Sequence, residues 1–142
     1  MSRLKLKAAD AEDLEILSAR LQDAVGKLRD FLWMPKERRF AVLLNRFRWE
    51  AGDDTRVQAA LHFDGVIRVL SQNIKLGAPE AVVALLAVRF IPKAEGDPAG
   101  TIELLLAGGG AFRLEVECID AELADLTQPW AAHARPRHEG EG

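Results

Sequence analysis

Residues 35–50 read Pro-Lys-Glu-Arg-Arg-Phe-Ala-Val-Leu-Leu-Asn-Arg-Phe-Arg-Trp-Glu, and this stretch decides the fold. Apolar residues first occupy even positions, from Phe40 to Leu44, and then odd positions around Phe47. Side chains alternate between the two faces of a strand, so the buried face changes partway along. Two interpretations stay open: the middle of the strand is buried on both sides, or a bulge near Asn45 re-aims it. Either way, the stretch predicts a central strand of a curved sheet.

Four arginines in this stretch are the candidate ligand-binding residues of the chain. With Phe47 and Trp49 they supply the phosphate-pairing groups and stacking planes of a β-surface that binds single-stranded nucleic acid. Alternation, however, places these rings on the face opposite two of the arginines. Glu115 and Glu117, on a later strand, are available partners that would neutralise the arginines within the molecule. The candidates are Arg38, Arg39, Arg46 and Arg48, of which the last two are expected to face solvent or acidic neighbours.

Length and composition predict one domain. The chain has 142 residues, of which 49% are hydrophobic. A domain near this size buries roughly 70% of the surface that its unfolded chain exposes, which is enough for a substantial core. We therefore expect a single domain over residues 1–130, followed by a C-terminal tail over 131–142 that lacks a core-forming pattern.

Charge, cysteine content and hydropathy restrict the setting in which the protein works. A net charge of −3 argues against a general nucleic-acid or membrane binder. Cys118 is the single cysteine, which excludes an internal disulfide framework and fits a reducing compartment. Basic residues interrupt the apolar positions near the N-terminus, and no apolar run approaches the roughly 20 residues of a spanning helix. We expect a cytoplasmic protein that does not contact a membrane.

The N-terminal region predicts one strand and one helix. Residues 3–8 alternate between apolar and basic side chains, as in a strand with one buried face. Asp10 is a good helix N-cap, and leucines recur beyond it at three- and four-residue spacing. We expect a helix over residues 11–24 that is ended by Gly26 in a left-handed conformation.

Turn residues between alternating segments predict three hairpins. The first turn contains Pro35, the second is Asp64-Gly65 and the third is the triple glycine at 108–110. The predicted hairpins join 28–34 to 38–50, 57–63 to 66–74, and 101–107 to 111–118.

Two segments mix helix and strand signals. Residues 79–91 combine Pro79 and alanines, which favour helix, with β-branched residues. We expect a turn of helix there and then a strand from about Leu85, followed by a turn-rich connection over 92–100. Residues 119–126 fit either a bulged strand or a short helix, and both interpretations stay open. The whole pattern predicts an α+β fold, with an N-terminal helix and seven or eight mostly antiparallel strands that form a curved sheet, a sandwich or a partly closed barrel.

Three short motifs resemble functional ones, but each has a simpler structural interpretation. The triple glycine precedes alternating strand residues rather than a helix, which favours a hairpin turn over a phosphate loop. Cys118 continues the apolar face of its strand, so we expect a packed thiol rather than a nucleophile. His62 and Asp64 share one strand face but supply only two ligands. We therefore predict no catalytic residue, no metal site and no cofactor.

Linked motifs along the chain carry a resemblance to a known family. They are Asp-Ala-Glu-Asp-Leu at 10–14, Leu-Gln-Asp-Ala-Val at 21–25, Pro-Lys-Glu-Arg-Arg-Phe at 35–40, Asn-Arg-Phe-Arg-Trp-Glu at 45–50, Leu-Ala-Gly-Gly-Gly-Ala at 106–111 and Glu-Val-Glu-Cys-Ile at 115–119. With them the chain resembles a family of small alphaproteobacterial proteins catalogued as a domain of unknown function. The resemblance implies a cytoplasmic bacterial protein, sometimes encoded near histidinol dehydrogenase. It carries over no activity, cofactor or site.

These observations favour a non-enzymatic binding or protein-interaction module. The expected partner is another protein, or a second copy of the chain, bound through an exposed sheet edge. The alternative is a nucleic-acid or anionic-ligand binder that uses Arg38, Arg39, Arg46 and Arg48. A small enzyme of unknown reaction is the third interpretation.

Overall fold

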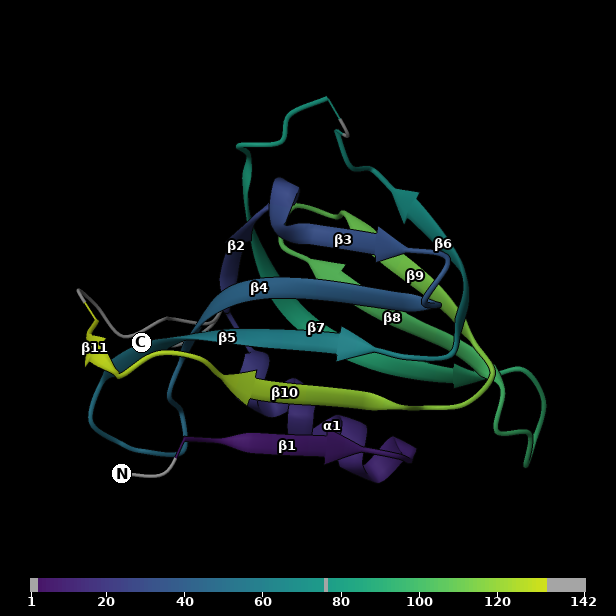
Figure 1. Ribbon diagram of the computed structural model, residues 1–142, viewed down its shortest axis with the longest axis horizontal. Coiled ribbons are helices and arrows are strands. Elements are labelled where there is room, and N and C mark those ends of the chain that lie inside the picture. Colours follow the sequence, from purple (N-terminus) through teal and green to yellow (C-terminus); the bar gives the residue numbers. More distant parts are fainter. Residues whose placement is uncertain (1–2, 76, 133–142) are drawn as a thin grey trace.

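The computed structural model describes residues 3–75 and 77–132, and its main feature is one long antiparallel sheet with a single α-helix (Figure 1). The α+β class is confirmed, but the sheet has 11 strands rather than seven or eight. Its order is β1-β10-β5-β4-β2-β7-β8-β9-β6, with β3 beside β4 and β11 beside β5. The sheet is not closed, because β1 and β6 each end the path. The elements are β1 Lys5–Ala8, α1 Ala11–Leu21, β2 Val25–Lys27, the 3-10 turn Leu28–Asp30, β3 Phe31–Met34, β4 Arg39–Phe47, β5 Thr55–Phe63, β6 Val66–Gln72, β7 Val82–Pro92, β8 Gly100–Leu106, β9 Ala111–Val116, β10 Ala121–Asp125 and β11 Trp130–Ala131.

The sheet bends so that its two halves face each other across the core (Figure 1). The short strand β2 joins the halves, since Val25 pairs with Asn45 of β4 and with Ala84 of β7. Aromatic rings fill the space between them: the Phe112 ring of β9 lies 5.1 Å from the Phe31 ring and 5.4 Å from the Phe40 ring. The inward residues of both halves form one hydrophobic cluster.

The helix α1 packs its leucines into this core. Asp10 caps it as predicted, accepting a 2.8 Å hydrogen bond from the Asp13 backbone N–H. The helix ends at Leu21, earlier than predicted, and Asp23 rather than Gly26 takes the left-handed conformation, with φ of 63°. Gly26 instead lies in β2, where an added Cβ would come within 2.9 Å of the Leu43 carbonyl oxygen. Among the described residues, no helix is long and apolar enough to cross a lipid bilayer, and this includes α1.

The central strand β4 runs without the predicted bulge. Its pairing with β5 is continuous from Phe40 to Phe47. The even positions face the core along the whole strand, so Arg46 continues the buried series that begins at Phe40. Neither open interpretation of the changed apolar phase is right. The odd-position Phe47 is buried because Trp49, with ring centroids 4.7 Å apart, and Arg56 lie against it.

Two of the three predicted hairpins are confirmed and one is wrong. β3 pairs with β4 and β8 pairs with β9, both antiparallel. β5 and β6 are not partners, because β6 pairs with β9 in the other half of the sheet. At Asp64-Gly65, with Gly65 at φ of 69°, the chain crosses from one half to the other instead of folding back. A turn dipeptide favours a change of direction, but it does not choose the strand that comes next.

Further segments also differ from the sequence predictions. Strand β7 begins at Val82, so residues 79–91 contain a turn and a strand but no turn of helix. In the open segment 119–126, Ala121–Asp125 forms strand β10, so the short helix is wrong, and β10 pairs with β1 and β5 instead of extending β9. Cys118 is exposed rather than packed, because β9 ends at Val116 and Ile119 takes the buried place beyond it. Residue 131 belongs to β11, which pairs with β5, and the predicted tail from residue 133 onward lies outside the described residues.

Candidate functional site

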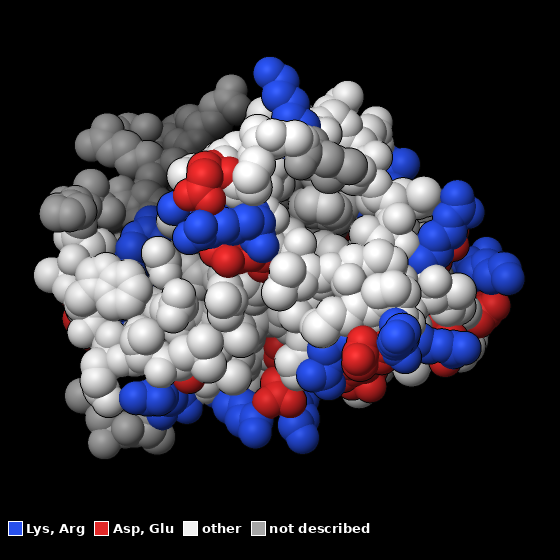
Figure 2. Space-filling view, turned by 45° about the horizontal axis from the view of Figure 1, so that its top comes forward, with Lys and Arg blue, Asp and Glu red and all other residues white. Residues whose placement is uncertain are grey.

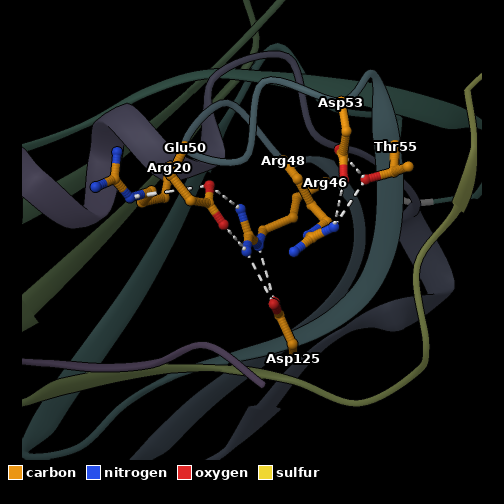
Figure 3. A network of polar contacts seen from close by, with 7 residues as sticks. All are labelled: Arg20, Arg46, Arg48, Glu50, Asp53, Thr55 and Asp125. Atoms are coloured by element: carbon orange, nitrogen blue, oxygen red, sulfur yellow. Dashed lines mark hydrogen bonds and ion pairs between the residues drawn. The ribbon is translucent and has the colours of Figure 1, made fainter. Parts of the chain in front are cut away.

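The polar cluster around Arg46 is the first candidate site (Figure 3). Arg46 is 0% exposed, and its guanidinium lies between two carboxylates. Nε and Nη2 donate 2.8 Å hydrogen bonds to the two oxygens of Asp125, while Nη1 and Nη2 donate bonds of 3.0 and 2.8 Å to Glu50. Arg20 of α1 approaches Glu50 at 3.9 Å. Both carboxylates therefore bind the same cation in a bidentate manner.

Register and turn geometry bring these groups together. Arg46 pairs with Val57 of β5, and on the other side of β5 Asp125 pairs with Ala59. The long arginine side chain therefore crosses β5 to reach Asp125. Glu50 comes from a turn after β4, closed by a 3.1 Å hydrogen bond from the Ala51 N–H to the Arg48 carbonyl oxygen.

Burial and hydrogen bonding act in opposite directions in this cluster. Burial alone would lower the pKa of Arg46, but its hydrogen bonds to Asp125 and Glu50 outweigh burial and raise that pKa. Burial alone would raise the pKa of Glu50, but the hydrogen bonds from Arg46 hold it below its usual value. The Glu50 side chain is 24% exposed and that of Asp125 is 5% exposed, but the same guanidinium holds both carboxylates. The cluster is built to hold a buried charge in place.

A polar cleft of about 330 Å³ opens beside this cluster. Glu50 and Asp125 line one part of it, and Arg48 lines another. Arg48 itself donates hydrogen bonds from Nη1 to Asp53 and Thr55, at 3.2 and 3.0 Å (Figure 3). The other basic side chains on the lining are Arg3 and Lys5.

The four candidate arginines do not form one surface. Arg39 begins β4 and Arg38 directly precedes it, so that Arg39 lies about 23 Å along the strand from Arg46 at roughly 3.3 Å per residue. Arg38 pairs with Glu117 at 2.7 Å, and Arg39 with Asp64 at 2.7 Å. Pairing within the molecule is confirmed for all four, but only Arg38 uses the predicted acidic strand segment. Arg46 faces the core and meets the acidic side chains Asp125 and Glu50, so of the two expected surroundings it has acidic neighbours rather than solvent.

A second candidate is an apolar patch on the outer face of β3, β4 and β5, a face that also carries Arg39, Asn45, Gln58 and His62. Its central row is Leu43, Ala60 and Ala124, adjacent across β4, β5 and β10. Leu32 of β3 is 50% exposed beside it, and a shallow hollow of about 220 Å³ lies on this face. In Figure 2, charged side chains gather toward the rim of a broad pale surface over these strands. The outer side of a one-sided antiparallel sheet is normally polar.

The sequence contained a signal for this face. Ala41, Leu43 and Ala60 occupy outward positions of β4 and β5, where alternation predicts polar side chains. The changed phase in the central stretch comes neither from burial on both sides nor from a bulge. It reflects instead an apolar outer surface in the middle of β4 and a buried arginine at its end.

Of the residues considered as a metal site or a nucleophile, His62 lines the hollow on the second candidate face, whereas Cys118 lies outside both candidate sites. His62 Nδ1 is 3.3 Å from Asp64, and its Nε2 is 3.7 Å from Glu122. Within residues 3–75 and 77–132, no group of three or more His, Cys, Asp or Glu residues is arranged to hold a metal ion. Cys118 is exposed on the bend after β9.

Comparison with known proteins places the chain in a family. A family model described as a protein of unknown function (DUF2948) matches residues 4–138. The chain belongs to this family. No curated protein matches this chain, and no solved structure does. DUF2948 membership therefore supplies no activity, and the function has to be argued from the surfaces and clusters described above.

Proposed function

We propose that this DUF2948 protein is a non-enzymatic module that binds another protein through the apolar outer face of β3, β4 and β5. The observation that best supports this proposal is the row Leu43–Ala60–Ala124, which places three apolar side chains on the outer side of adjacent strands. Small side chains let a partner's backbone or side chains approach closely. Contiguous apolar surface on a soluble protein is characteristic of interaction sites.

The edge of β3 gives this face a natural extension. Among the described strands, β3 pairs only with β4, so its other edge has no strand neighbour. An unpaired strand edge offers N–H and C=O groups to an extended segment, and a partner strand added there would continue the apolar face. The edge strand β1 differs from β3, because it carries Lys5 and Lys7, charged side chains that protect an edge.

The proposed cellular location of the module is the cytoplasm. Cys118 is a single, exposed thiol, and such a thiol persists in a reducing compartment. The location and a bacterial origin are part of the proposal.

Leu32→Glu tests the proposal, with Ile16→Glu as its matched control. The two side chains are 50% and 49% exposed, but Ile16 lies on α1 and away from the proposed face. Immobilised wild type, L32E and I16E are each incubated with an extract of the source organism, and the retained proteins are quantified. We expect a protein that wild type and I16E retain in stoichiometric amount and that L32E loses. Identical retention by all three, with unchanged thermal unfolding of both variants, would contradict the proposal.

The cleft beside Arg48 supports a second candidate, an anionic-ligand binder. Three basic side chains line it, two of them near the N-terminus and one from the end of β4. Of the four arginines considered from the sequence, only Arg48 lines this cleft, while Arg38 and Arg39 would act at a separate place. Titration calorimetry with inorganic phosphate, and with a labelled oligouridylate at low salt, tests this candidate. Binding that Arg48→Gln removes would favour it, and absence of binding to wild type would exclude these two ligand classes.

A further inference from the structure

An ion triad crosses the outer face of the other half of the sheet. Glu103 of β8 lies directly between Arg89 of β7 and Arg113 of β9 in the strand register. Arg89 Nη2 donates a 2.8 Å hydrogen bond to Oε1, and Arg113 Nε donates a 3.0 Å bond to Oε2. The Glu103 side chain is 5% exposed although it stands on an outward position, whereas the arginines are 59% and 46% exposed. The two guanidinium groups therefore cover the carboxylate and are held in place by it.

This arrangement leaves the arginines able to bind a second acceptor. A guanidinium carries five N–H donors in a fixed plane, and each arginine donates one hydrogen bond to Glu103. Fixing a guanidinium in advance reduces the conformational entropy lost when it binds a carboxylate. Hydrogen bonds from Arg89 hold the pKa of Glu103 below its usual value, so the carboxylate stays charged at neutral pH.

Exposed aliphatic side chains surround the triad. Leu70 of β6 lies opposite Arg113 in the register. In the next row Ile91 is opposite Thr101, and Ile67 and Ile91 both line a hollow of about 320 Å³. Exposure is 57% for Ile67 and 50% for Ile91. A partner on this face would thus meet apolar contacts directly beside the arginines.

Charge and side-chain type together indicate the partner. The face presents Arg68, Arg89, Arg113 and the neighbouring Lys93 against Glu103 and Glu115, in a chain whose net charge is −3. An acidic partner is complementary to it. The large exposed apolar residues described on β6 and β7 are all aliphatic, whereas single-stranded nucleic acid needs aromatic stacking planes. They are Ile67, Leu70, Val82, Leu86 and Ile91.

We propose that the outer face of β7, β8, β9 and β6 binds a segment of another protein in which an acidic residue is flanked by aliphatic ones. The carboxylate is bound by Arg89 and Arg113 above Glu103, and the flanking side chains contact Leu70 and Ile91. This surface is separate from the β3–β4–β5 face, so the module has two contact surfaces of different chemistry.

Selection from a random displayed-peptide library on the immobilised full chain tests the inference. We expect enriched peptides that combine Asp or Glu with neighbouring Ile, Leu or Val. The triple variant R89Q/E103Q/R113Q replaces the triad by neutral side chains of similar size, without leaving a buried charge. It should bind the enriched peptides at least about tenfold more weakly, as expected from the loss of charge-assisted hydrogen bonds. The single variant E103Q keeps both arginines and should keep the preference for acidic peptides.

Each other outcome has a defined meaning. Enrichment of peptides without acidic residues, equal binding by the triple variant, or no enrichment at all would overturn the inference. A labelled oligouridylate that wild type retains at low salt and the triple variant loses would assign the face to nucleic acid instead. The same selection on L32E should be unchanged, because Leu32 lies on the other face. Failure of this inference therefore leaves the proposed function to its own test.

Discussion

Arg46 and Asp125 are joined by two parallel hydrogen bonds of 2.8 Å across the width of β5, where both side chains are buried. The most basic stretch of the chain thus directs its central arginine into the core rather than toward a ligand. A buried guanidinium is tolerated because Asp125 and Glu50 together accept hydrogen bonds from all three of its nitrogens.

Removing the arginine should therefore be costly. We expect Arg46→Ala to lower the free energy of unfolding by about 3–5 kcal/mol, because Asp125 would remain buried without its cation. Arg39→Ala is the control, since the Arg39–Asp64 pair is partly exposed, at 42% and 27%, and should contribute about 1 kcal/mol or less. Urea denaturation of both variants measures the difference, and similar losses would show that burial does not set the importance of these pairs.

Acid should weaken the fold partly through Glu103. Its pKa is lowered in the folded protein by hydrogen bonds from Arg89 and Arg113, while the unfolded chain has the usual value of about 4.3. Below that value the unfolded state binds more protons, so stability falls as pH falls toward the folded pKa. In E103Q this contribution is absent, and the urea midpoint should fall less between pH 6 and pH 3. Parallel pH curves for E103Q and wild type would speak against the triad.

Cys118 should react while the protein is folded. It is exposed after β9, so a thiol reagent such as DTNB should modify it completely without denaturant. Cys118→Ser should change the free energy of unfolding by no more than about 0.5 kcal/mol, as for an ordinary surface position. Protection of the thiol until urea is added would instead support the packed position predicted from the strand pattern.

Gly100 should tolerate no side chain. A Cβ at this position would collide with the Ile91 carbonyl oxygen and approach the Phe90 ring within 2.8 Å. We expect Gly100→Ala to destabilise the protein by about 1–3 kcal/mol, the usual cost of overpacking. An added Cβ at Gly77 would meet no atom within 4 Å, so Gly77→Ala should be nearly neutral in the same thermal unfolding assay. Equal melting temperatures for the two variants would rule out the close approach of β7 and β8.

Local patterns predicted the elements better than their pairing. Asp10 correctly predicted the helix start, and the triple glycine correctly predicted the β8–β9 hairpin. Both signals depend only on neighbouring residues, so the sequence contains all that is needed to interpret them. Asp64-Gly65 gave an equally strong local signal, yet β6 crosses to β9. That choice depends on long-range burial of apolar faces, which a single sequence does not specify.

The candidate sites show the same limit. Internal pairing of the arginines was predictable from charge balance, but the partners of Arg46 were not, because Asp125 lies 79 positions away and meets it only through the β4–β5–β10 register. The triad around Glu103 also depends on register across three strands. Ala41, Leu43 and Ala60 interrupt the polar positions of β4 and β5 in the sequence. They indicate an apolar outer patch only when the inward face of each strand is known.

A double-mutant cycle on Arg46 and Asp125 tests most directly the claim that the basic strand is an internally paired core strand. Wild type, R46M, D125L and R46M/D125L are compared by urea denaturation at pH 7, with Glu50 present in all four. We predict a coupling energy of about 2–3 kcal/mol, so that the double variant is much more stable than the two single losses imply. A coupling energy below about 0.5 kcal/mol would contradict the claim and return Arg46 to the set of residues available to a ligand.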